Sequence, residues 1–264
     1  MNKVIVYCLI IIFSIYLVIC GVLFFIQESL LFYPTKISLD YAFKFSNDFE
    51  EITIETEDGI RLNNLLFLSK EKKGVVLFFH GNAGALNGWG TGASLYVENG
   101  YDVFYTDYRG FGKSEGEIYS EKQLIQDAQL VYDFVKSKYG EEQLIIEGIS
   151  LGTGIATQMA ANNNPKSLVL SAPYSSLKHL ILEKMPFILP FLIKYKLNSI
   201  KYLAKVNCSI TLFHGEQDDL IPHQHSVRLK EKFEKIDLNL IPNRGHNDVF
   251  LSKSYQEKMN EILK

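Results

Sequence analysis

Hydrophobic residues follow several distinct patterns along the chain, and the first is an almost unbroken apolar run from residue 4 to residue 26. At about 1.5 Å per residue, a helix of this length exceeds the ~30 Å hydrocarbon core of a bilayer. The run is too long for a secretory signal and keeps bulky residues to its end. A lipoprotein-type Cys20 is disfavoured because Ile19, the residue before it, is large. We therefore predict an uncleaved membrane anchor at residues 1–31.

The charges around this run predict its orientation. Lys3 precedes it, whereas Glu28 follows it and the next lysine is Lys36. Positive charge before the span favours a cytoplasmic N-terminus, so we expect a single-pass protein whose domain lies on the extracytoplasmic side. Tyr33 is expected at the membrane interface, and Pro34 is expected to end the helix.

The remaining residues, 32–264, show the patterns of one folded domain. Strict alternation over 51–56 and a second run over 60–68 predict an antiparallel hairpin. From residue 74 onward, apolar strands alternate with amphipathic helices, so the sheet is expected to be mostly parallel and doubly wound. These strands are expected at 74–79, 101–108, 144–146, 167–171, 210–213 and 237–241, and the helices at 91–99, 120–139, directly after residue 150 and at 249–263.

An insertion at about 174–205 interrupts this alternation. It is rich in leucine, isoleucine and phenylalanine, is divided by Pro186 and Pro190, and carries interleaved lysines. One interpretation is a short helical cap that buries its apolar face on the domain. The other is a lid over the site, with an exposed face that meets lipid or an acyl chain.

Composition and charge narrow the class of protein. The formal net charge is −3, which leaves no global basic field for nucleic acid. The three cysteines form neither a disulfide framework nor a metal-ligand pattern, and we expect no cofactor and no metal. His223 and His225 could form a zinc pair, but exposed residues at the start of a helix are the favoured interpretation.

The strongest chemical signal is Gly148-x-Ser150-x-Gly152. An apolar strand leads into this motif and a run of small residues leads out of it, which predicts strand, tight turn and helix. A serine in such a turn presents its hydroxyl above the edge of the sheet, and only very small flanking residues allow strand and helix to approach so closely. Ser150 is therefore a candidate nucleophile.

The same five-residue pattern occurs a second time around Ser114. That copy lies in a polar loop and no helix-forming run follows it directly, so the structural context of a nucleophile is missing. We expect Ser114 to be a solvated turn residue.

A serine nucleophile needs a base, and the base needs an orienting acid. After Ser150 the chain offers carboxylates at 216–219, behind a predicted strand, and His246, behind the last one. Catalytic groups of open α/β sheets gather at the carboxyl ends of the strands, where both loops would lie. The order serine, acid, histidine is also the one that this architecture uses.

Together, the motifs at 80–84, 107–114, 148–152, 214–218 and 245–248 resemble those of the α/β-hydrolase superfamily. The chain looks most similar to membrane-anchored, single-domain serine hydrolases, a group that includes protein-depalmitoylating members. The resemblance implies the α/β-hydrolase fold, with Ser150 as nucleophile, Asp218 as acid and His246 as base. Asp219 remains an alternative for the acid.

The resemblance also implies an oxyanion hole formed by the backbone N–H groups of Leu151 and Asn82. His80 and Asp107 are implied to brace loops and not to take part in catalysis. The expected activity is cleavage of an ester or thioester, with a lipid, a lipidated protein or a small ester as substrate. A serine peptidase of the same fold and a non-catalytic, membrane-tethered binding module are the alternatives.

Overall fold

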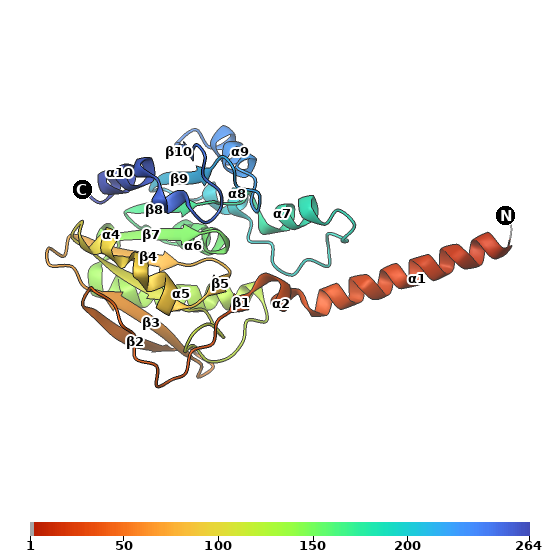
Figure 1. Ribbon diagram of the computed structural model, residues 1–264, viewed down its shortest axis with the longest axis horizontal. Helices are drawn as coiled ribbons and strands as arrows, with labels where there is room; N and C mark the ends of the chain where they lie inside the picture. Colours follow the sequence, from red (N-terminus) through yellow and green to blue (C-terminus); the bar gives the residue numbers. More distant parts are fainter. Residues whose placement is uncertain (1–2) are drawn as a thin grey trace.

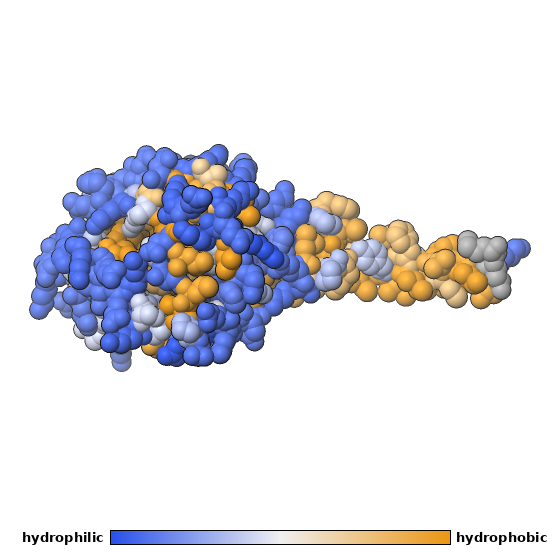
Figure 2. All heavy atoms as spheres, turned by 90° about the horizontal axis from the view of Figure 1, so that it is seen from above, coloured by the Kyte–Doolittle hydropathy of each residue, from blue (hydrophilic) through white to orange (hydrophobic). Residues whose placement is uncertain are grey.

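The computed structural model describes residues 3–264 (Figure 1). The first helix, α1 (Lys3–Phe25), leaves the domain as a projecting rod and is followed by α2 (Gln27–Leu31). Figure 2 shows this rod as hydrophobic along nearly all its length, next to a mostly hydrophilic domain. Within residues 3–264, α1 is the one helix long and apolar enough to cross a membrane.

The end of this helical segment differs from the sequence prediction. The helix stops at Leu31 and not at Pro34, because Tyr33–Pro34 forms a two-residue strand, β1, that pairs in parallel with β5 (Ala83–Gly84). The chain that follows α2 is thus tied to the loop after the first parallel strand.

The domain is built on one eight-stranded sheet with the order β10-β9-β8-β7-β4-β6-β3-β2. The hairpin β2–β3 and the pair β3–β6 are antiparallel, and all other neighbours are parallel. The fold predicted from the sequence is therefore confirmed. The strands are β2 (Phe49–Glu55), β3 (Arg61–Phe67), β4 (Gly74–Phe79), β6 (Tyr101–Thr106), β7 (Leu144–Ile149), β8 (Ser167–Ser171), β9 (Ser209–Gly215) and β10 (Ile236–Ile241).

Helices cover both faces of this sheet, and the central strand β4 shows why. Its alternate side chains Val75, Leu77 and Phe79 join one buried cluster, while Val76 and Phe78 join the cluster on the opposite face. A strand that is apolar on both sides needs such double coverage. The helical elements are α3 (Leu86–Trp89), η1 (Gly90–Ala93), α4 (Ser94–Val97), α5 (Glu121–Tyr139), η2 (Glu141–Gln143), α6 (Leu151–Asn162), α7 (Leu177–Lys184), α8 (Ser199–Leu203), α9 (Gln224–Lys232), η3 (Val249–Leu251) and α10 (Lys253–Ile262).

Two helix predictions needed correction. The helix expected at 91–99 begins at Leu86 and runs as three short pieces, in a stretch that contains three glycines. The terminal helix is split, since Ser252 leaves helical geometry and caps α10 by accepting a hydrogen bond from the Tyr255 N–H. By contrast, Ser120 caps α5 and Gly140 ends it, where the sequence placed these boundaries.

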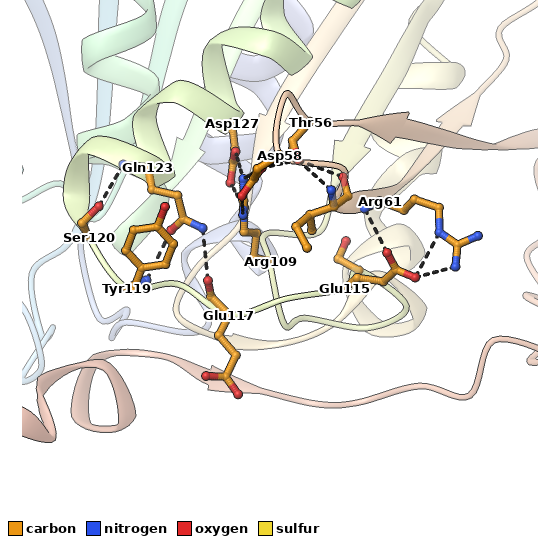
Figure 3. A network of polar contacts seen from close by, with 12 residues as sticks. Thr56, Asp58, Arg61, Arg109, Glu115, Glu117, Tyr119, Ser120, Gln123 and Asp127 are labelled. Atoms are coloured by element: carbon orange, nitrogen blue, oxygen red, sulfur yellow. Dashed lines mark hydrogen bonds and ion pairs between the residues drawn. The ribbon is translucent and has the colours of Figure 1, made fainter.

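The edge hairpin is fastened to the sheet by Arg109, in the loop after β6 (Figure 3). Its guanidinium donates two hydrogen bonds to Asp58, in the β2–β3 turn, at 2.6 and 2.7 Å. Two more, at 2.6 and 2.9 Å, go to Asp127 on α5. One side chain therefore joins three separate segments with paired, charge-assisted bonds.

The cap region at 174–205 contains α7 and α8, joined by a loop. Ile193, Tyr195 and Leu197 are buried in it, whereas Phe187 and Phe191 are 51% and 78% exposed. One portion of the segment is therefore core and another is an exposed apolar surface.

Candidate active site

Ser150 lies at the junction of β7 and α6 with φ 51° and ψ −118°, a strained backbone for a residue with a Cβ. The flanking glycines make this junction sterically possible. A Cβ on Gly148 would lie 2.6 Å from the Gly152 carbonyl oxygen, and one on Gly152 would lie 2.1 Å from the Phe79 carbonyl oxygen. The glycines of the motif are therefore required by backbone contact.

His246 lies in the loop after β10, with its Nε2 3.0 Å from the Ser150 Oγ. This loop can lie close to the end of β9 because that strand ends at Gly215, where a Cβ would lie 2.3 Å from the Arg244 carbonyl oxygen. Asp248 fixes the loop by accepting a hydrogen bond from the Gly245 N–H at 2.6 Å.

Asp218 completes the chain of contacts, since its Oδ2 lies 2.7 Å from the His246 Nδ1. Its Oδ1 accepts the N–H groups of Leu220 at 3.0 Å and Ile221 at 2.8 Å, which orients the carboxylate. Burial alone would raise the pKa of Asp218, but hydrogen bonds from His214, His246 and the Ile221 N–H hold it well below its usual range. The group is therefore ionised at neutral pH.

The carboxylate of the alternative acid, Asp219, is not hydrogen-bonded to His246. Asp219 is exposed, and its backbone carbonyl accepts a hydrogen bond from Lys184 of α7 at 2.7 Å. The structure thus brings Asp218, and not its neighbour, to His246. An ionised carboxylate that accepts the Nδ1–H leaves the Nε2 free to take the proton of the serine hydroxyl.

The two expected oxyanion donors border the same serine. Leu151 opens α6 directly after Ser150, and Asn82 follows β4 in a loop whose Gly81 would place a Cβ 3.7 Å from the Ser150 Cβ. This loop is held by β1, because the Tyr33 N–H donates to the Asn82 carbonyl at 2.8 Å. Sequence reasoning missed this support, since a two-residue strand has no periodicity.

His80 and Asp107 lie beneath the site and are fully buried, with the His80 Nε2 3.4 Å from an Asp107 oxygen. The His80 Nδ1 lies 2.7 Å from the Gly81 carbonyl oxygen, and Asp107 accepts the Leu86 N–H at 3.3 Å. Neither side chain is hydrogen-bonded to Ser150, Asp218 or His246. Both contacts are of the kind that brace a loop.

Ser114 corrects the sequence prediction in one respect. It is buried and not solvated: its hydroxyl donates to the Asp107 carbonyl at 2.9 Å and accepts the Asn63 N–H at 2.8 Å. Its partners come from β3 and the end of β6, which a local pattern does not reveal.

The histidine pair at 223 and 225 also differs from expectation. His223 is half-buried, and His225 is fully buried and lies 2.9 Å from a carboxylate oxygen of Glu183 in α7. The ring therefore joins α9 to the cap. Among residues 3–264, no cluster of three histidine, cysteine or acidic side chains could hold a metal ion.

A groove of about 850 Å³ lies between the α3–α4 segment and α10. Ile149 and Asn247, the sequence neighbours of Ser150 and His246, line it, as does Trp89. Trp89 also lies near the loop after β4, since its ring would contact a Cβ on Gly81 at 3.5 Å. Trp89 is the one tryptophan of the chain, a signal that sequence reasoning left unused.

Comparisons with known proteins agree with this architecture. Residues 70–204 match the family described as "Serine aminopeptidase, S33". An uncharacterized protein of Mycobacterium tuberculosis is 30% identical over 241 residues, which cover 88% of this chain and 85% of that protein. The lysophosphatidylserine lipase ABHD12 of Danio rerio is 32% identical over 177 residues, or 59% of this chain. The match spans 46% of that lipase, about half its length.

Among solved structures, an esterase from Pyrococcus furiosus superposes with a TM-score of 0.71 at 18% identity, covering 88% of this chain and 98% of the esterase. That similarity concerns the fold. Because the family match spans half of the sequence and the mycobacterial relative nearly all of it, the chain belongs to the α/β-hydrolase superfamily.

Proposed function

We propose that this protein is a membrane-anchored serine hydrolase that cleaves carboxylic ester or thioester bonds through an acyl-enzyme. The observation that carries the proposal is the hydrogen-bonded chain from Asp218 through His246 to Ser150, with the serine on a strained turn. In this proposal residues 1–31 are the anchor, 32–264 the hydrolase domain and 174–205 its cap.

The proposed reaction begins when the Ser150 Oγ attacks the substrate carbonyl while the His246 Nε2 accepts its proton. Asp218 stabilises the resulting imidazolium through the Nδ1–H. The backbone N–H groups of Leu151 and Asn82 are the proposed donors to the oxyanion. His246 then returns the proton to the leaving alcohol or thiol, and water hydrolyses the acyl-enzyme by the reverse sequence.

The groove supports a substrate with an apolar chain. Its lining by Trp89, Leu95 and Ile149, the residue before Ser150, offers hydrophobic surface in a volume typical of small-molecule sites. Two superfamily relatives have lipid or ester substrates in their names, a lysophosphatidylserine lipase and an esterase. We therefore place the acyl chain of the substrate in this groove.

The projecting helix supports the anchor. Most of its large apolar side chains are about half exposed or more, and Phe25 reaches 77%, an arrangement that water disfavours and a bilayer satisfies. The single lysine before the span supports the proposed extracytoplasmic position of the domain.

The test measures hydrolysis by the full-length protein in detergent. The substrates are acyl esters of increasing chain length, acyl thioesters, lysophospholipids and aminoacyl anilides. We expect turnover of esters or thioesters and a loss of at least ~1,000-fold in kcat for Ser150→Ala. The exposed Ser254→Ala is the matched control. Unchanged turnover in Ser150→Ala refutes the mechanism.

The name of the matching family favours a second candidate, an aminopeptidase. Turnover of the aminoacyl anilides alone would support it against the esterase. Absence of turnover on every substrate, with the protein folded, would favour the binding module instead.

A further inference from the structure

The cap and the membrane anchor are in direct contact through the segment 185–195, which we call the cap loop. Gln27, just past α1, forms two hydrogen bonds with its backbone: the Nε2 donates to the Leu192 carbonyl at 2.8 Å, and the Oε1 accepts the Lys194 N–H at 2.9 Å. Glu28 adds an ion pair with the Lys194 ammonium at 3.1 Å and accepts the Tyr195 hydroxyl at 3.1 Å.

A third contact lies further along the anchor. The Tyr16 hydroxyl donates to the Phe187 carbonyl at 2.8 Å. Tyr16 precedes Phe25, the end of α1, by nine residues, which correspond to ~13 Å along a helix. Even after subtraction of the length of a tyrosine side chain, the Phe187 carbonyl lies well inside the end of the span. If α1 crosses a bilayer, this part of the cap loop lies within the hydrocarbon.

The chemistry of the cap loop suits that location. Phe187 and Phe191 are 51% and 78% exposed, so the domain leaves them without cover. A backbone carbonyl without a hydrogen-bond donor costs free energy in hydrocarbon. The Phe187 carbonyl has such a donor in the Tyr16 hydroxyl. The charged contact of Glu28 with Lys194 sits beyond the end of α1, at the expected level of the head groups.

The face between anchor and loop is apolar as well. A small cavity of about 70 Å³ is enclosed there by Cys20, Phe24 and Leu30 of the anchor and by Ile181, Met185 and Ile188 of the cap, among others. In Figure 1 the loop after α7 reaches out from the domain toward α1. The two elements therefore form one continuous apolar surface. Because α1 is expected to lie in a bilayer, the bilayer is also the environment that should cover the exposed side of the cap loop.

We propose that the cap loop inserts into the membrane leaflet next to the domain, packed against the C-terminal half of α1. This inference rests on the anchoring part of the proposed function and extends it. The cap becomes a second membrane-embedded element, and Phe187 and Phe191 contact acyl chains of the bilayer. A substrate with an acyl chain would then reach the domain from the membrane and not from water.

The experiment places an environment-sensitive fluorophore at single cysteines of the full chain, in a background with Cys8, Cys20 and Cys208 replaced by alanine. The labelled positions are Phe191→Cys in the cap loop, Ile12→Cys in α1 and Tyr119→Cys on the domain surface. The protein is reconstituted in phosphatidylcholine vesicles with and without doxyl-labelled acyl chains, and quenching is compared. All three side chains are more than half exposed, so labelling leaves the core intact.

We expect doxyl lipids to quench the probes at 12 and 191 by more than half and to leave the probe at 119 unchanged. Gln27→Leu should weaken quenching at 191 and leave it unchanged at 12, because it removes both bonds from Gln27 to the loop. Quenching at 12 without quenching at 191 would overturn the inference while the anchor stands. Absence of quenching at both positions would overturn the anchor and the inference together.

Discussion

Glu147 lies three residues before the proposed nucleophile and is fully buried in β7. Its carboxyl group accepts hydrogen bonds from the Tyr96 hydroxyl at 3.0 Å and the Tyr255 hydroxyl at 3.1 Å. Burial raises its pKa to about 7, although these two hydrogen bonds act in the opposite direction. The group should therefore make the stability of the fold depend on pH.

The sign follows from the two states. In the unfolded chain the carboxyl group titrates near its usual value of 4.5, and in the folded chain near 7. Between these values the folded state holds a proton that unfolding releases, so stability falls as pH rises. A pKa difference of this size stabilises the folded state by about 3 kcal/mol at low pH. This contribution is lost by about pH 8, and above that pH the group no longer changes the stability.

We predict that Glu147→Gln removes this loss. The unfolding free energy of the variant minus that of the wild type should increase by about 3 kcal/mol between about pH 5 and pH 8. The assay is denaturant unfolding of the full chain in detergent, followed through the fluorescence of Trp89. The matched control is Glu231→Gln, the same substitution at an exposed carboxylate. A pH-independent difference for Glu147→Gln would refute the reasoning.

Three further predictions concern the loops, the acid and the groove. Arg109→Ala should destabilise the fold by about 3 kcal/mol in denaturant unfolding, because it leaves Asp127 without its ion-pair partner, whereas Arg61→Ala, at an exposed pair, should have a much smaller effect. Asp218→Asn should lower kcat by ~10⁴, the loss that the same change of the triad acid causes in chymotrypsin-type proteases, and Asp219→Asn should not; equal losses would contradict the assignment. Gly88 lines the groove with open space at its Cβ position, so Gly88→Leu should raise KM for long-chain esters and leave short esters and the Gly88→Ala control unchanged.

The sequence predicted the sheet and the strand–turn–helix at Ser150 well because both depend on local patterns. Strands buried on two faces are apolar throughout, and the turn at Ser150 requires glycine on each side for contacts within one strand–helix unit. The choice of Asp218 depended on register within a single loop, and the structure brings that residue to His246.

The errors have long-range causes. Ser114 looked solvated because its own loop is polar, yet its partners are backbone groups at positions 63 and 107. His225 is buried by contact with the cap, whose position no local pattern encodes. The pairing of Tyr33–Pro34 with the loop at 83–84 likewise joins segments fifty residues apart.

The most direct test of the central claim is covalent labelling of Ser150 by a fluorophosphonate probe, which reacts with an activated serine hydroxyl. The wild type should be labelled, with the adduct mapped to Ser150 by mass spectrometry, and Ser150→Ala should not be labelled. Ser114→Ala should retain labelling even if its lost hydrogen bonds to the backbone lower stability. Labelling that persists in Ser150→Ala, or an adduct mapped to another residue, would contradict the account.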